Sequence, residues 1–286
     1  MIDVIDSHAA VRTILTVPLT ERPALLRAML EPVAGMYRYF PGEVDLVAMH
    51  HMGSGFRVDV GDDRALPALD ALRDADVWGR VRTALHAALD HQLASTPGIA
   101  VPDIQVMIVL GDSSNAHFMD VTLGMGANGS TNDMWLNFWP SRENLARVEA
   151  TAVHEFNHQL RYATVEWPAT VTVGEHVVSE GLADAFAREL YGDDLGYTRI
   201  GVAAQHDEAA YAKVVDGLGV TGMQNFAAYV HGDAIAARFG ATPVGLPTGA
   251  GYAVGNRLVD AYLAKTGRTA AQALHVDAAD VIAAAG

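Results

Sequence analysis

The sequence predicts an α+β fold, in which a small sheet lies between mainly helical N- and C-terminal flanks. Three observations favour this class. Two short apolar runs with the character of strands lie near the middle of the 286-residue chain. Helical periodicity dominates on both sides of them. Half of the residues are hydrophobic and only 19% are charged, which is typical of a globular protein.

Residues 1–95 are expected to form a mainly helical N-terminal region. The segments PALLRAMLEPVAGMYRYF (23–40) and DVWGRVRTALHAALDHQLAST (76–96) both indicate helices, which proline–glycine pairs at Pro41-Gly42 and Pro97-Gly98 interrupt. No clear linker follows. We therefore expect residues 96–286 to form the core, joined to the N-terminal region in one composite domain.

Two strands are expected in the core. IQVMIVLG (104–111) is a β-branched run closed by glycine, and MWLNFWP (134–140) alternates and ends at proline. Before the second strand, GMGANGSTND (124–133) is rich in Gly, Asn and Ser. This composition suits a loop that forms a tight hairpin or a flexible approach to a site.

A pair of helices should follow the strands. Ser141 is a suitable N-cap for a helix of about 142–162, and an irregular link containing Trp167-Pro168 comes next. The second helix should span about 174–191. Beyond it, residues 200–286 read as further helices, interrupted by a Gly/Pro-rich break at 240–251.

The ends of the second helix have recognisable signals. Thr172 and Glu175 have the spacing of a capping box, and Gly192 stands where a glycine commonly ends a helix. Glu175 is therefore assigned to the cap.

The first helix of the pair carries the motif HEFNH at residues 154–158. His154 and His158 are four residues apart and point to the same side. One interpretation is an ordinary polar stripe that faces water. The remainder of the helix is unusually apolar, however, and this favours a mostly buried helix whose narrow polar strip forms the floor of a cleft.

The spacing of HEFNH has a chemical explanation. Two imidazoles one turn apart can both reach one Zn²⁺ at about 2.0–2.1 Å. Glu155 then lies beside the metal, where it can accept a proton from an activated water. The chain has no cysteine, so a zinc site has to use histidines and carboxylates.

A catalytic zinc also needs a third protein ligand. The metzincin pattern is excluded, because it requires glycine and histidine where this chain has Arg161 and Thr164. The thermolysin-like alternative takes a glutamate from a second helix. Glu180, which lies 22 residues after His158, is our candidate.

Neighbours of Glu180 on the second helix support this choice. Asp184 lies one turn later and could hold the N–H of a zinc-bound histidine, while Gly181 would let two helices approach closely. A solvated helix face is the alternative interpretation for the two carboxylates. His176, one turn before Glu180, is a lesser rival as ligand.

These segments resemble a known family. VHEFNHQLR (153–161), VVSEGLADAFARELYG (177–192) and GYAVGNRLVDAYLAKTG (251–267) are similar to the YjaZ-like family of predicted zinc-dependent proteases, a gluzincin-type group. The resemblance covers roughly residues 130–286. It implies a zincin-like metallopeptidase core, with a small mixed sheet packed on the active-site helix. It also implies one Zn²⁺ per chain, with His154, His158 and Glu180 as its ligands and Glu155 as the catalytic base.

Two further roles remain open at this point. Tyr252, expected in a glycine-flanked turn, is our candidate for stabilising the oxyanion, and Tyr229, His231 and His176 are its rivals. The strand MWLNFWP resembles the edge strand with which zincins bind extended peptides. An internal strand is the alternative.

Charge and hydropathy limit the partners and the compartment. The net charge of −15 disfavours nucleic acid and anionic membranes. The N-terminus lacks the basic region of a secretory signal, and no apolar run is long enough to span a membrane, so we expect a cytoplasmic protein.

Three functional hypotheses follow. The first is a zinc metallopeptidase that acts on peptides or unfolded protein. The second is a zinc-binding but non-proteolytic regulatory protein, and the third is a metal-free helical protein with a coincidental motif. The intact Glu155 favours the first over the second, because a pure binder does not need a base.

Overall fold

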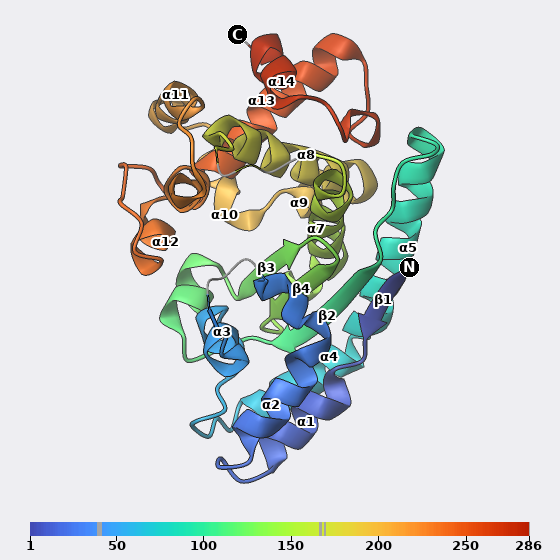
Figure 1. Cartoon of the computed structure of the whole chain (residues 1–286), viewed down its shortest axis with the longest axis vertical. Coiled ribbons are helices and arrows are strands. Elements are labelled where there is room, and N and C mark those ends of the chain that lie inside the picture. Colours follow the sequence, from blue (N-terminus) through green and yellow to red (C-terminus); the bar gives the residue numbers. More distant parts are fainter. Residues whose placement is uncertain (39–41, 166–167, 169, 286) are drawn as a thin grey trace. The chain divides into compact units, whose positions relative to one another are not determined.

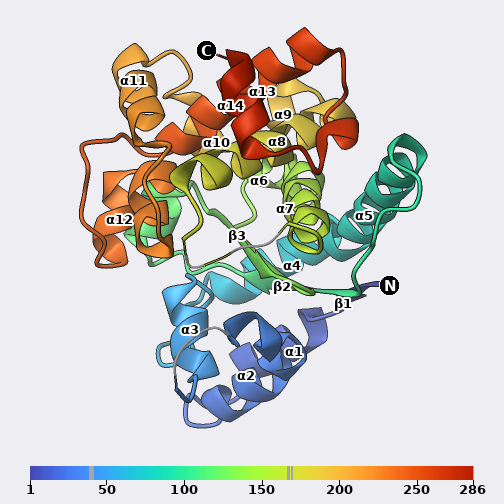
Figure 2. The same ribbon diagram turned by 45° about the horizontal axis from the view of Figure 1, so that its top comes forward.

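The computed structural model describes all residues except 39–41, 166–167, 169 and 286 (Figures 1 and 2). The chain groups into two compact units. Unit 1 contains residues 1–87 and 101–155, and unit 2 contains residues 88–100 and 156–286. The helices α5 (Val77–Ser95) and α7 (Val148–Tyr162) each continue from one unit into the other. The domain division expected near residue 95 stays a prediction.

Unit 1 is built on a four-stranded mixed sheet. Its order is β1-β2-β4-β3, in which β1 and β4 pair parallel with β2, and β3 pairs antiparallel with β4. The strands are β1 (Ile2–Ile5), β2 (Ile104–Leu110), β3 (Met125–Ser130) and β4 (Asp133–Phe138). The strands expected at 104–111 and 134–140 are confirmed. Their apolar side chains are buried on both faces of the sheet, as parallel pairing requires.

Two expectations about this sheet are wrong. Residues 124–133 are not a loop, because β3 occupies most of them, but the tight hairpin is confirmed: a turn at Asn132, with φ of +83°, leads into the antiparallel partner β4. The segment MWLNFWP is not an edge strand, because β4 lies between β2 and β3. The antiparallel edge of the sheet is therefore β3.

The N-terminal region is mainly helical, as expected, apart from β1. Before α5, the described helices of this region are α1 (His8–Thr16), α2 (Arg22–Leu30), a 3₁₀ segment (Glu31–Tyr37), α3 (Leu46–Met52) and α4 (Ala65–Asp74). Beyond this region, a π-helical turn (His117–Val121) follows β2. Helices α1 and α4 pack on β2. Of the expected break at Pro41-Gly42, Pro41 lies outside the described residues, as does Trp167 of the later link.

The helix expected at 142–162 begins at the right place but is divided. Ser141 caps α6 (Arg142–Leu145) by accepting a hydrogen bond from the Asn144 backbone, and α7 starts three residues after α6 ends. The side-chain amide of Asn144 donates to the carbonyls of Leu123, Gly124 and Trp139. These long-range bonds fix α6 independently of α7.

Unit 2 is helical. Its longest helix, α8 (Val173–Tyr191), has the expected ends, because Thr172 Oγ1 accepts from the Glu175 backbone at 3.1 Å and Gly192 follows with φ of +76°. The other helices are α9 (Asp193–Gly196), α10 (Arg199–Val202), α11 (Glu208–Gly217), α12 (Asp233–Arg238), α13 (Ala250–Thr266) and α14 (Ala278–Ala285). Shorter helical turns are formed by Met223–Asn225, Ala227–His231 and Ala271–Ala273.

Helices α8, α13 and α14 pack together in unit 2 (Figure 2). Helices α8 and α13 approach at Gly181 and Gly255. A Cβ atom built on Gly181 would lie 2.2 Å from the Gly255 carbonyl oxygen. The contact is between backbones, so neither helix can yield by turning a side chain.

Replacing Gly181 by alanine should therefore destabilise unit 2. We expect a loss of about 2 kcal/mol or more in the free energy of unfolding, because overpacking outweighs the roughly 1 kcal/mol by which alanine favours a helix. Urea denaturation measures it. Gly219→Ala is the control, because its Cβ would meet nothing within 4 Å. Equal stability of the two variants would contradict the close approach.

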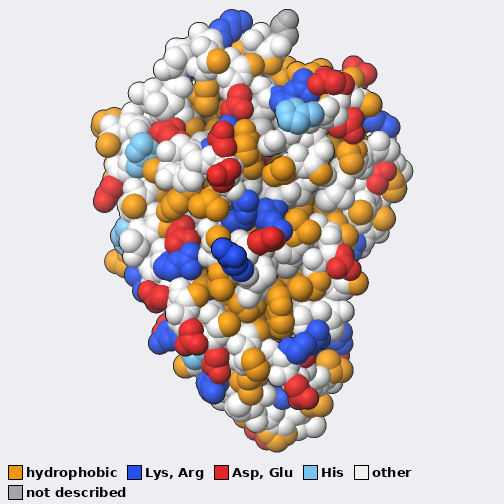
Figure 3. Space-filling view, turned by 180° about the vertical axis from the view of Figure 1, so that it is seen from behind, with side chains coloured by type: hydrophobic (Ala, Val, Ile, Leu, Met, Phe, Trp, Pro, Cys, Tyr) orange, Lys and Arg blue, Asp and Glu red, His pale blue; other side chains and the backbone are white. Residues whose placement is uncertain are grey.

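On the face drawn in Figure 3, acidic and basic side chains are interspersed with apolar ones. Within the described residues, none of the helices combines the length and the apolar character needed to cross a lipid bilayer.

Candidate metal centre

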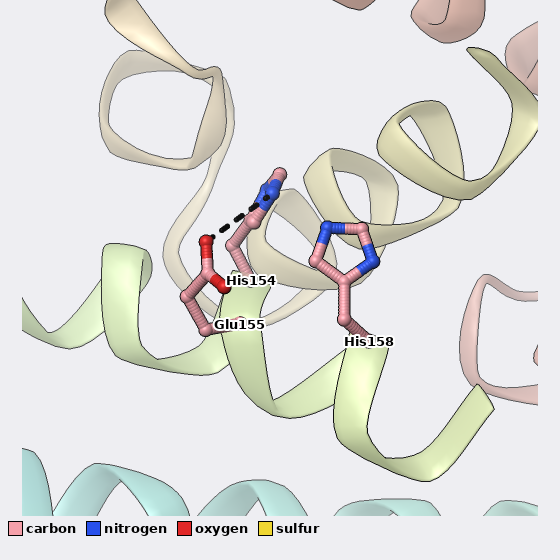
Figure 4. Close-up of side chains that lie close together, drawn as sticks. All are labelled: His154, Glu155 and His158. Atoms are coloured by element: carbon pink, nitrogen blue, oxygen red, sulfur yellow. Dashed lines mark ion pairs between the residues drawn. The ribbon is translucent and has the colours of Figure 1, made fainter. Parts of the chain in front are cut away.

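Helix α7 buries the histidines of HEFNH. His154 is 6% exposed and His158 is 5% exposed, so the water-facing interpretation of this stripe is wrong. The side chains of His154, Glu155 and His158 project from the same stretch of α7 (Figure 4). One possible ligand atom of each residue lies within 4.8 Å of those of the other two. His154 Nε2 and Glu155 Oε1 are 4.0 Å apart. The apolar remainder of the helix is buried around them, as the sequence indicated.

Helix α8 brings a carboxylate to the second histidine. Within unit 2, Glu180 Oε2 lies 3.2 Å from His158 Nε2. The other ring nitrogen, Nδ1, lies 3.2 Å from Ser179 Oγ, and the ring stacks on Tyr162 at an interplanar angle of 11°. Glu180 is 6% exposed, so the solvated-face interpretation is also wrong for this residue.

The donor set and its spacing fit a zinc ion. Two ligand atoms bound to one tetrahedral zinc are about 3.4 Å apart, given metal–ligand distances of about 2.0–2.2 Å. The 3.2 Å between His158 Nε2 and Glu180 Oε2 is close to that value. Because Nδ1 faces a serine hydroxyl, Nε2 is the nitrogen that points to the carboxylate. Imidazole and carboxylate together are a common catalytic zinc set.

Asp184 is completely buried and has partners within unit 2. Its carboxylate accepts hydrogen bonds from the backbone and the hydroxyl of Thr198 and from the side-chain amide of Asn256. Its solvated-face interpretation is therefore wrong. The role of Asp184 toward a zinc-bound histidine stays a prediction.

Tyr252 belongs to a row of aromatic rings in unit 2. It lies in the first turn of α13 and is largely buried, so the expected glycine-flanked turn is wrong. Its hydroxyl is 3.4 Å from His231 Nδ1. The ring of Phe226 contacts His231 edge-on at 4.7 Å between centroids, and contacts His176 at 4.6 Å.

Burial favours the neutral imidazole in both histidines of this row. Burial lowers the pKa of His176 to about 4 and also lowers the pKa of His231. The nearby Glu180 carboxylate opposes both shifts. The rings therefore lie within electrostatic reach of the candidate ligand, and each can donate or accept one hydrogen bond.

Comparison with known proteins shows the family of the chain. The family model described as "Predicted Zn-dependent protease (DUF2268)" matches residues 85–283. The chain belongs to this family. The YjaZ-like resemblance of the motif segments is consistent with it. An "Uncharacterized protein YjfC" of Bacillus subtilis (strain 168) is 29% identical over 236 residues, which are 80% of this chain and 77% of that protein. No solved structure matches the chain.

Some members of the site have no signal in the sequence. Thr198 and Asn256 hold Asp184 from 14 and 72 residues away, and no local pattern indicates such distant partners. Ser179 could have been predicted as a neighbour of the site, because it directly precedes Glu180 on the expected second helix. Its contact with the second histidine depends on how two helices pack.

Proposed function

We propose that this member of the family is a zinc-dependent metallopeptidase that hydrolyses peptide bonds. One Zn²⁺ per chain would be held by His154, His158 and Glu180. The observation that carries the proposal is the buried pair of His158 and Glu180, 3.2 Å apart, beside the HExxH turn of α7. The family's description supports the zinc dependence. A zincin-like core is part of the proposal.

Glu155 has the position of a general base. One of its carboxylate oxygens lies within 4.8 Å of a ring nitrogen of each histidine. Because Glu155 directly follows the first histidine, its carboxylate would lie beside a metal that both histidines hold. Zinc bound here supplies Lewis-acid activation of a water molecule and of the peptide carbonyl. Glu155 accepts the proton of the attacking water and then delivers it to the leaving amine.

Tyr252 is proposed to stabilise the oxyanion by hydrogen bonding. Its hydroxyl lies 3.4 Å from His231 Nδ1. A neutral His231 can accept a hydrogen bond from the phenol in the resting state and release it when a negative oxygen develops. His231 itself and His176 remain rivals for the role of donor, because both lie near Glu180.

Tyr252→Phe should lower kcat by about 100-fold, which is typical when one oxyanion donor is removed. The zinc content should be unchanged, because the ring still packs in the same place. Steady-state hydrolysis of a fluorogenic peptide measures the effect. Tyr262→Phe, on the same helix, is the control and should leave kcat unchanged. If Tyr252→Phe is as active as the wild type, the donor is another residue.

The proposed substrate is a peptide or an unfolded protein, acted on in the cytoplasm, without nucleic acid or membrane as partner. A broad peptide library, analysed by mass spectrometry, tests this. The zinc-loaded chain should produce cleavage that a chelator abolishes and zinc alone restores. A chain that holds zinc but cleaves no peptide would instead favour a non-proteolytic zinc-binding protein on the same fold.

A further inference from the structure

Arg161 is a buried cation that the proposed chemistry does not use. It lies near the end of α7 and is 1% exposed. All of its N–H groups have acceptors: Nε and Nη2 donate to Glu175 Oε1, Nη1 donates to the carbonyls of Leu274 and Val276, and Nη2 also donates to the carbonyl of Val276. A buried charge is costly to desolvate, so such complete pairing indicates a specific role.

These contacts join the helices that carry the candidate ligands. Arg161 follows His158 by three residues on α7, and Glu175 precedes Glu180 by five residues on α8. The ion pair therefore lies about one helical turn from the contact between His158 Nε2 and Glu180 Oε2. A salt bridge at this distance opposes sliding or rotation of one helix against the other.

The segment Leu274–Val276 also contacts the end of α7, in addition to α8. Arg161 donates to both of its end carbonyls, and the ring of His275 hydrogen-bonds to the backbone of Leu160 on α7. The end of α7 is thus held from α8 and from the C-terminal part of unit 2. Glu175, assigned from the sequence to the helix cap, uses its side chain for Arg161.

We propose that Arg161 is a positioning residue for the metal centre. Through Glu175 and the carbonyls of Leu274 and Val276, it holds α7 against α8 so that His158 Nε2 and Glu180 Oε2 stay at the separation one zinc ion requires. This inference rests on the proposed zinc site. Without Arg161 both ligands are present but their spacing varies, so zinc has to order them on binding and binds more weakly.

The test compares Arg161→Met and Arg161→Lys with the wild type. Zinc affinity is measured by competition with a chromophoric chelator, and the site geometry by the visible absorption of the Co²⁺-substituted chain. We expect Arg161→Met to bind zinc about 10-fold or more weakly, with an altered Co²⁺ spectrum. Arg161→Lys should bind zinc more tightly than Arg161→Met but more weakly than the wild type, because lysine keeps the positive charge but lacks the planar set of guanidinium N–H donors.

Arg188→Met is the matched control. Arg188 is a largely buried arginine of α8 that pairs with Asp260 and Tyr197, away from the ligand pair. Its loss should destabilise unit 2 while the zinc affinity stays within about 2-fold. Wild-type affinity and spectrum in Arg161→Met would overturn the positioning role. If that variant does not fold, unchanged zinc affinity in both Arg161→Lys and Glu175→Gln would overturn it. A wild type without zinc overturns the proposed function and this inference together.

Discussion

Glu155→Gln is expected to lower kcat for peptide hydrolysis by about 10²–10⁴-fold, the range that a positioned general base contributes. Glutamine has nearly the same shape, so helix α7 and the burial of its histidines should be preserved. The amide, however, cannot accept the proton of an attacking water. The chain should therefore keep its zinc and lose its activity. Steady-state kinetics and metal analysis of the same preparation measure both.

The control for this substitution is Glu143→Gln. Glu143 is an exposed carboxylate of α6, the helix before α7, and its neutralisation changes the net charge by the same amount. It should leave kcat unchanged. Wild-type activity in Glu155→Gln would exclude the proposed mechanism, whereas loss of zinc as well would show that Glu155 acts as a ligand.

Glu180→Gln should weaken zinc binding by about 100-fold or more, beyond the 10–100-fold range typical of residues that only orient ligands. The substitution removes the negative charge that faces His158 Nε2 at 3.2 Å, and a neutral amide is a poor zinc ligand. Competition with a chromophoric chelator measures the dissociation constant. The stabilisation by zinc should fall in parallel, from about 4 kcal/mol at 1,000 times the wild-type dissociation constant to about 1.4 kcal/mol at the same zinc concentration.

His176→Gln distinguishes the rival ligand. His176 lies one turn before Glu180 on α8 and is also buried. It therefore has a similar environment to Glu180 but carries an imidazole in place of a carboxylate. Its substitution should leave the zinc affinity within about 3-fold. The opposite pattern, with affinity retained in Glu180→Gln and lost in His176→Gln, would make His176 the third ligand.

The helices of the site could be predicted because their signals are local. Ser141 and Thr172 cap their helices with the side chains the patterns indicated, and Gly192 ends α8 with a positive φ. The HEFNH spacing depends only on helical geometry. The two helices and the motif on them therefore follow from short stretches of sequence.

The sheet was less predictable because pairing is long-range. β1 has only four residues, and its pairing with β2 joins Ile2 to Ile104 across the chain. β3 contains glycine and asparagine, which strands usually avoid, and it is stabilised by pairing with β4. Whether MWLNFWP was an edge or an internal strand depended on this partner.

The burial of the polar side chains of the site also could not be predicted without the tertiary structure. An i, i+4 pair such as Glu180 and Asp184 suits a wet helix face as well as a metal centre. The wet face is ruled out only by the packing of α7 and α13 against α8, which buries both carboxylates and brings His158 to Glu180 and Asn256 to Asp184. Tyr252 was placed in a turn because its flanking glycines suggested one, but Gly251 and Gly255 lie within α13 and permit close helix contacts.

The metal content of the purified chain tests the central claim most directly. The protein is prepared without chelators or added metal and analysed by inductively coupled plasma mass spectrometry, beside a variant in which His154 and His158 are both alanine. We predict one equivalent of zinc in the wild type and almost none in the variant. Zinc well below one equivalent in the folded wild type, or equal zinc in both proteins, would contradict the account.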